Sequence, residues 1–63
     1  MFQYETRILN AEMRPALIIE AFYLNDASAI RTGTKFAAGR SFEVWRDTDC
    51  VYRAPQADSV EAA

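Results

Sequence analysis

The sequence contains no histidine and only one cysteine, Cys50, among its 63 residues. A single cysteine cannot form an intramolecular disulfide. Without histidine, neither a mixed Cys/His zinc site nor a Cys–His catalytic pair can be built. We therefore expect no catalytic residue, no metal site and no cofactor. We interpret Cys50 as a small, partly buried apolar side chain.

The chain also lacks a long apolar run and a strong excess of one charge. The N-terminal stretch "MFQYETRILN" alternates polar and apolar residues, which is not the pattern of a signal peptide. No apolar segment approaches the length of a membrane span. We expect a cytoplasmic protein without a membrane partner. The net charge is −2, and without Asp58 and Glu61 the acidic and basic residues balance, so a nucleic-acid partner is not expected.

The shortness of the chain limits the stability that it can gain alone. At this length, burial of apolar surface barely offsets the conformational entropy lost on folding. Small domains add disulfides, a metal or a partner subunit. Since the first two are not available here, we predict a homodimer.

The first half of the sequence predicts a β-hairpin. Residues 2–10 alternate with a period of two, and "ALIIEAFYL" is an apolar run rich in β-branched and aromatic residues. We expect this second strand to be central in its sheet. Pairing of opposite charges favours a register with Arg7 opposite Glu20 and Ile8 opposite Ile19. Phe2, Tyr4, Thr6 and Ile8 would then share a face with Leu17, Ile19, Ala21 and Tyr23.

The stretch "NDASAIRTGTKFAAG" changes to a helical period. Asn25, Asp26 or Ser28 can cap its N-terminus, and Gly39 is a suitable stop. The apolar stripe would consist of Ala29, Ile30, Gly33, Phe36 and Ala37. We interpret Gly33 as a site of close approach between helix and sheet.

The segments "SFEVW" and "CVYRA" predict two further strands around the turn "RDTD". A loop of even length places Phe42, Val44 and Val51 on one face. It places Glu43, Trp45, Cys50 and Tyr52 on the other; an odd loop would reverse one strand.

The predicted fold class is α+β, with the order ββαββ: a four-stranded antiparallel sheet with one helix packed on one face. Residues 1–54 would form one domain, and residues 55–63 a flexible tail. One helix covers only one face, so apolar residues on the open face need a partner. A second copy packed face to face would supply it. The predicted dimer interface comprises Leu9, Ile18, Phe22, Leu24, Trp45 and Tyr52.

Several other features have both a functional and a structural interpretation. Trp45 and Tyr52 could stack on a base, but nearby acidic residues favour cross-strand or dimer packing. Arg31, Lys35 and Arg40 form a possible basic contact face, although a solvated helix face explains them as well. Asp47 and Asp49 could bind a divalent ion, but their position in a short turn favours turn chemistry.

The layout resembles that of short uncharacterised bacterial proteins: an alternating hairpin, an alanine-rich helix ending in "AAGR", and a strand like "FEVWR". The resemblance spans about residues 2–53, and its most specific piece is "GRSFEVWR". It implies a small protein of unknown function and attaches no activity to any residue.

The function that we predict is that of a non-catalytic interaction module that self-associates through the open sheet face. An alternative is a weak nucleic-acid or regulatory binder that uses the basic helix face. A third is a small-molecule carrier or enzyme with a pocket between two subunits, lined by Trp45, Tyr52 and an acid such as Glu20.

Overall fold

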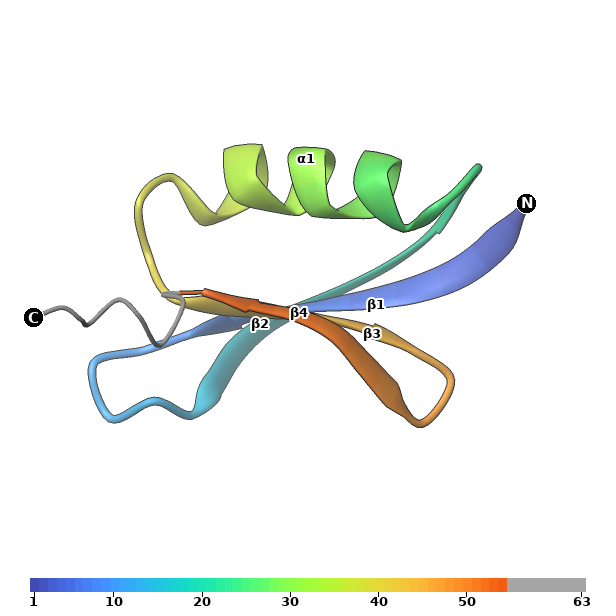
Figure 1. Ribbon diagram of the computed structural model, residues 1–63. Helices are drawn as coiled ribbons and strands as arrows, with labels where there is room; N and C mark the ends of the chain where they lie inside the picture. The colour runs from blue at the N-terminus through green and yellow to red at the C-terminus, as the bar shows by residue number, and fades with distance from the viewer. Residues whose placement is uncertain (55–63) are drawn as a thin grey trace, which may run out of the picture.

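The computed structural model describes residues 1–54, and the predicted tail at 55–63 lies outside them. Five elements follow in the order ββαββ: β1 (Phe2–Leu9), β2 (Pro15–Tyr23), α1 (Asp26–Ala37), β3 (Phe42–Arg46) and β4 (Asp49–Ala54). The strands form one antiparallel sheet with α1 lying across one face (Figure 1). The predicted α+β architecture is therefore confirmed.

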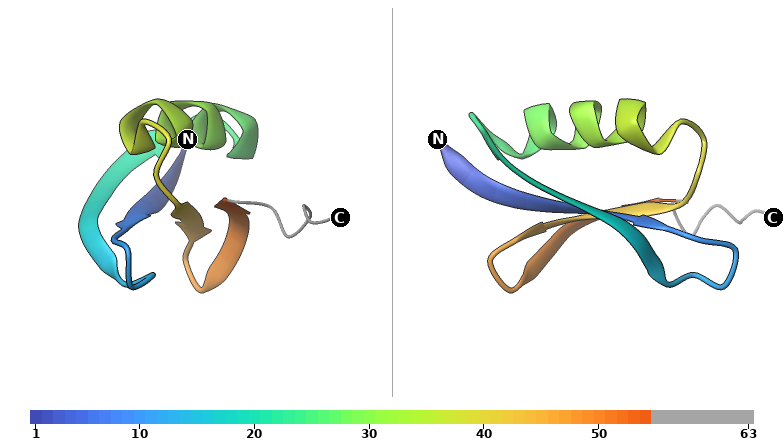
Figure 2. Two further views of the ribbon diagram at one scale, coloured as in Figure 1. Left: turned by 90° about the vertical axis from the view of Figure 1, so that its left-hand side faces the viewer. Right: turned by 180° about the vertical axis from the view of Figure 1, so that it is seen from behind.

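β2 is an edge strand, so the prediction that it is central was wrong. The sheet order is β2-β1-β3-β4, with β1 between β2 and β3. In the right-hand view of Figure 2, β2 crosses at the front of the sheet below the helix. The first four residues of β2 and alternate residues after them are exposed. An apolar run shows that a strand is suited to burial, but the pairing of β1 with β3 decides which strand is left outside.

The first hairpin has a register two residues away from the one predicted. Ile8 lies opposite Leu17 and Arg7 opposite Ile18, which brings Glu5 opposite Glu20. The faces are as predicted, because a shift of two residues preserves the alternation of side chains. The turn fixes this register: the Asn10 side chain accepts hydrogen bonds from the backbone N–H groups of Glu12 and Arg14, both at 3.0 Å. A register shift between Ile8 and Leu9 completes the adjustment.

The core lies between α1 and the central strands. Tyr4, Ile8 and Val44 are its largest fully buried apolar side chains. Gly33 lies above them, and a Cβ atom at this position would be 3.1 Å from Phe42 Cε2. It would also be 3.4 Å from methyl groups of Thr6 and Val44. The predicted close approach of helix and sheet at Gly33 is confirmed.

The ends of α1 follow from local chemistry. Asn25 is the N-cap, with its side chain accepting a hydrogen bond of 2.9 Å from the Ser28 N–H. Ala38 takes the left-handed conformation at the C-terminus, followed by Gly39 at φ 90°. Of the predicted apolar stripe, Ala29, Gly33 and Ala37 are buried and Ile30 packs against the core. Phe36 is 47% exposed, because the close approach at Gly33 leaves it at the side of the helix.

A β-bulge in the second hairpin reverses the predicted face of Tyr52. The loop between Arg46 and Asp49 has two residues, which is an even length as expected. The register nevertheless shifts between Val44 and Trp45, so that Val44 pairs with Tyr52 and Trp45 with Cys50. Val51 is the extra residue of this bulge. Tyr52 therefore turns toward the helix, where its ring centre is 5.5 Å from that of Phe42.

Candidate interaction surface

The six residues predicted to form an interface separate into three groups. Ile18, Phe22 and Leu24 are 53%, 62% and 67% exposed. Trp45 is half-buried on the open face. Leu9 and Tyr52 do not belong to this surface. Leu9 lies at the register shift that ends β1 and is only 5% exposed. Tyr52 packs against the core under the helix.

The part of the open face formed by β1, β3 and β4 is charged. The Arg7 guanidinium lies 4.5 Å from the centre of the Trp45 ring and forms an ion pair with Glu5. The Trp45 indole N–H donates to Glu43 at 2.9 Å, and Arg53 pairs with the same carboxylate at 3.1 Å. Most of the charge here is locally compensated, and the tryptophan ring is covered on one face by Arg7.

The apolar residues of the open face are therefore concentrated at one side of the sheet. We call Leu17, Ile18, Phe22 and Leu24 the β2 margin. Ile18 and Phe22 face away from the helix, whereas Leu17, opposite Ile8, faces toward it. Leu17 is still 49% exposed. The apolar surface thus extends around both sides of the edge strand.

Phe36 is a large apolar residue of α1 that remains exposed, on the flank of the helix nearer to β2. Thr34 and Ala37 line a hollow with Tyr52 and Ala54, so this side of the helix faces β4. Phe36 is on the opposite flank of the buried stripe by helical geometry, and that flank faces β2. Leu17 and Phe36, each about half exposed, are therefore the exposed apolar residues of β2 and α1 on the helix side of the sheet.

The other edge strand, β4, has the features that usually prevent pairing between sheet edges. It has six residues against nine in β2, it is bulged, and it carries Asp49 and Arg53. Short length, bulges and charge are the common means by which proteins protect an edge. β2 carries a single charge, Glu20, and its proline is at its first position. Only β2 is therefore suited to accept another strand along its full length.

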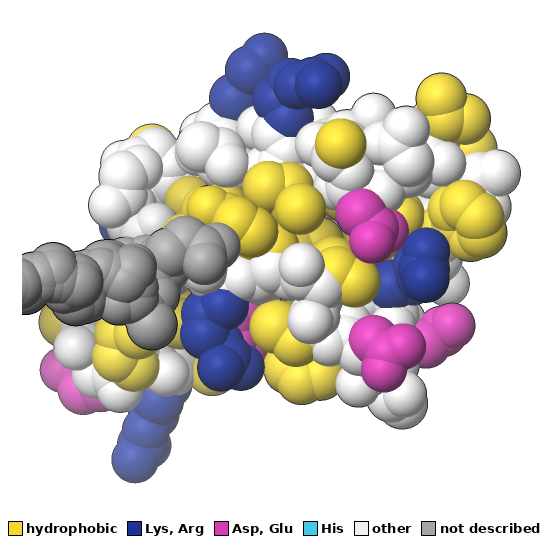
Figure 3. Space-filling model, in the orientation of Figure 1, with side chains coloured by type: hydrophobic (Ala, Val, Ile, Leu, Met, Phe, Trp, Pro, Cys, Tyr) yellow, Lys and Arg dark blue, Asp and Glu magenta, His cyan; other side chains and the backbone are white. Residues whose placement is uncertain are grey.

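The predicted basic face is divided by the end of the helix. Arg31 and Lys35 are exposed on α1, and basic side chains stand clear of the molecule above the helix in Figure 3. Arg40 lies beyond the end of α1 at Ala37, and its Nε donates to the Ala37 carbonyl at 3.1 Å. The helix itself thus presents two cations rather than a strip of three.

The structure places the predicted turn at Asp47 and Thr48, between β3 and β4, and Cys50 next to it in β4. Asp47 is in the two-residue loop with φ 55°, a left-handed conformation typical of turn aspartates. Cys50 is exposed, so the prediction that it is partly buried was wrong. The reason is that β4 is an edge strand.

The described residues offer neither a metal site nor the predicted pocket lined by both Trp45 and Tyr52. Among residues 1–54, no group of three or more potential ligands is placed to hold a metal ion. A shallow hollow near Trp45 includes Glu20 but not Tyr52, which the bulge turns away.

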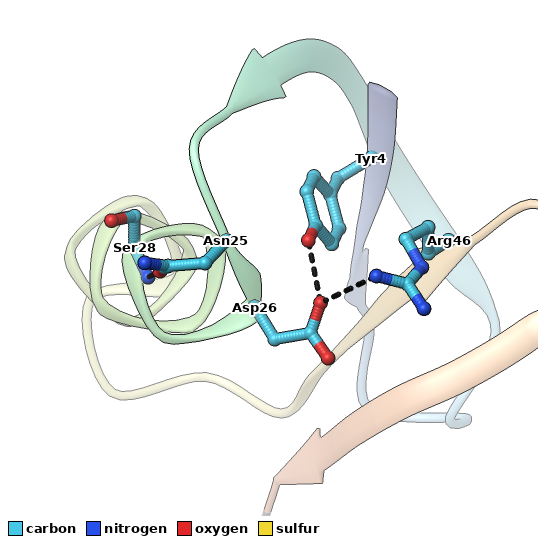
Figure 4. A network of polar contacts seen from close by, with 5 residues as sticks. All are labelled: Tyr4, Asn25, Asp26, Ser28 and Arg46. Atoms are coloured by element: carbon cyan, nitrogen blue, oxygen red, sulfur yellow. Dashed lines mark hydrogen bonds and ion pairs between the residues drawn. The ribbon is translucent and has the colours of Figure 1, made fainter. Parts of the chain in front are cut away.

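A polar network that the sequence did not suggest anchors α1 to the sheet. Tyr4, which is 1% exposed, donates its hydroxyl to Asp26 at 2.5 Å, and Arg46 pairs with the same oxygen at 3.4 Å (Figure 4). Burial, followed by the hydrogen bond to Asp26, raises the pKa of the Tyr4 phenol. The interactions of Arg46 with Tyr4 and Asp26 raise the pKa of its guanidinium. The first residue of the helix is thereby fixed to β1 and β3.

This network predicts a specific loss of stability at high pH. Because the pKa of Tyr4 is higher in the folded state than its ordinary value near 10, its contribution is complete below pH 10. That contribution is lost as the pH rises through the folded-state pKa. Denaturant titrations should show a steeper decline above pH 10 for the natural chain than for Tyr4→Phe. Tyr23→Phe is the control and should retain the steep decline; equal slopes for all three chains would contradict this role of Tyr4.

No family model, no curated protein and no solved structure matches this chain. Within residues 1–54, no helix has the length and apolar character needed to cross a membrane.

Proposed function

We propose that this protein is a non-catalytic interaction module that self-associates as a homodimer through the open sheet face, at the β2 margin. The observation that carries the proposal is the concentration of exposed apolar side chains there. Ile18, Phe22 and Leu24 are all more than half exposed, within seven residues of one another. Exposed apolar patches on small domains commonly mark interaction sites.

The size of the core supports a second copy as the partner. Seven hydrophobic residues are buried among residues 1–54, and three of these, Ala29, Ala37 and Leu9, lie at the helix stripe or at the end of β1. The one cysteine is exposed and free. A domain with so small a core gains stability by burying apolar surface against a partner.

Amide hydrogen exchange at two protein concentrations tests this proposal. We expect the amides of β2 that point away from β1 to exchange slowly in concentrated solution and quickly after dilution, because the second copy shields them only while bound. The amides of β3 serve as the internal control, since both neighbouring strands belong to the same chain. Exchange in β2 that is fast at every concentration would contradict pairing of a second copy along this edge. A dimer packed only on the open face would give the same result and is detected by its mass in solution.

A further inference from the structure

We propose that β2 pairs with β2 of a second copy, antiparallel and edge to edge. The two-fold axis passes between the two copies of Ile19, which lie opposite each other. The result is one continuous eight-stranded sheet. This inference rests on the proposed self-association and specifies its geometry. It differs from the face-to-face packing predicted from the sequence, because the structure shows that β2 is at the edge.

The first support is the apolar character of β2 on both faces. Ile18 and Phe22 project from the open face, and Leu17 from the helix face, all about half exposed or more. Face-to-face packing would cover Ile18 and Phe22 and leave Leu17 and Phe36 in water. A strand added beside β2 contacts side chains on both faces and also satisfies the outward backbone groups. Only edge pairing covers both sets.

Symmetry restricts how two copies of β2 can pair. A two-fold axis that places two antiparallel copies of one strand side by side must run perpendicular to the sheet. Both helices then lie on the same face of the joined sheet. Phe36 and Leu17 of each copy border the space between the two helices, directly above the paired strands. Their exposure in the single chain is thereby explained.

The choice of Ile19 as the centre follows from strand length and charge. An axis at Ile19 pairs Pro15 with Tyr23 of the second copy and so includes all nine residues of β2. Glu20 then lies opposite Ile18 of the second copy. An axis at Glu20 would instead place two glutamates directly opposite each other, which is unfavourable. Pro15, which cannot donate a hydrogen bond, falls at the end of the pairing, where it costs least.

The second copy is favoured over an unrelated strand by this self-complementarity. The large exposed side chains meet small ones across the axis: Phe22 lies opposite Ala16, and Leu17 opposite Ala21. The contrast with β4 restricts the pairing further. Because β4 is short, bulged and charged, edge pairing closes as a dimer at β2 and does not continue into a filament.

Engineered disulfides test the geometry. All variants carry Cys50→Ser, which removes the exposed natural thiol. Opposed residues in an antiparallel pair have Cα atoms about 5 Å apart, which suits a disulfide. We therefore expect Ile19→Cys to form a covalent dimer under mild oxidation. Ala21→Cys, on the same face two residues away, should not, because its copies are offset by about 13 Å along the strands.

A second variant avoids any loss of packing at Ile19. With the axis at Ile19, Leu17→Cys combined with Ala21→Cys places each thiol opposite its counterpart in the second copy. This double variant should run as a covalent dimer on a non-reducing gel, whereas each single variant should run as a monomer. Trp45→Cys, at the centre of the open face, is the probe for face-to-face packing.

The outcomes separate the two proposals. Cross-linking by Ile19→Cys or by the double variant, with none by Ala21→Cys or Trp45→Cys, supports edge pairing centred on Ile19. A non-covalent dimer that cross-links only through Trp45→Cys overturns edge pairing and leaves self-association intact. Cross-linking by Ala21→Cys alone overturns the centre at Ile19. A chain that is monomeric in every variant, in solution and after oxidation, overturns both proposals.

Discussion

Phe22→Glu should weaken the dimer by about 100-fold, leaving a monomer at concentrations where the natural chain is paired. Phe22 is 62% exposed in the single chain, so the fold does not depend on it. Each dimer loses two phenylalanine contacts and gains two carboxylates beside Glu20. Losses of about 1.4 kcal/mol per copy, modest for an aromatic interface residue, give this factor.

Light scattering measures the mass of this variant, and circular dichroism checks that it remains folded. Thr48→Glu is the matched control: it introduces the same charge in the exposed turn between β3 and β4. We expect Thr48→Glu to associate like the natural chain. A Phe22→Glu protein that keeps the mass of the natural protein on dilution would exclude Phe22 from the interface.

Gly33→Leu should strongly destabilise the protein, by up to about 3 kcal/mol. The first atom added at Gly33 would already be 3.1 Å from Phe42 Cε2 and 3.4 Å from Thr6 and Val44. The remaining atoms of leucine have no space between helix and sheet unless α1 moves away from the core. Overpacking of this kind typically costs about 1–3 kcal/mol, and occasionally more. The total stability of a domain of this size is about 3–9 kcal/mol.

Denaturant titration at a fixed protein concentration measures the effect of Gly33→Leu. Lys35→Leu introduces the same side chain on the exposed side of the same helix and should change stability by less than about 0.5 kcal/mol. A common unfolding midpoint for the two variants would mean that the helix does not approach the sheet as closely as the structure shows.

Much of the fold could be predicted because its elements are encoded locally. The period of two in residues 2–10 and the helical stripe through Ala29, Gly33 and Ala37 each indicate one element and its buried face. The close approach at Gly33 could also be predicted, since glycine on an apolar stripe has few other uses. These features depend on residues near one another in the chain.

The errors arose where structure depends on pairing between segments. The apolar content of β2 suggested a central strand, but which strand lies beside β1 depends on where the helix connection places β3. The charge pair Arg7–Glu20 suggested a register that the Asn10 turn overrules, and Arg7 instead compensates Glu5. The bulge at Val51 reversed Tyr52 without any change in loop length. The exposed apolar surface therefore lies at the edge of the sheet and not in the middle of the open face, where the sequence predicted it.

Self-association of the natural chain is tested most directly by its mass in solution. Light scattering over a dilution series should give about twice the 7.1 kDa of one chain at high concentration and should approach 7.1 kDa on dilution. A mass of 7.1 kDa at every concentration, up to the solubility limit, would contradict the proposed function and the paired edge together.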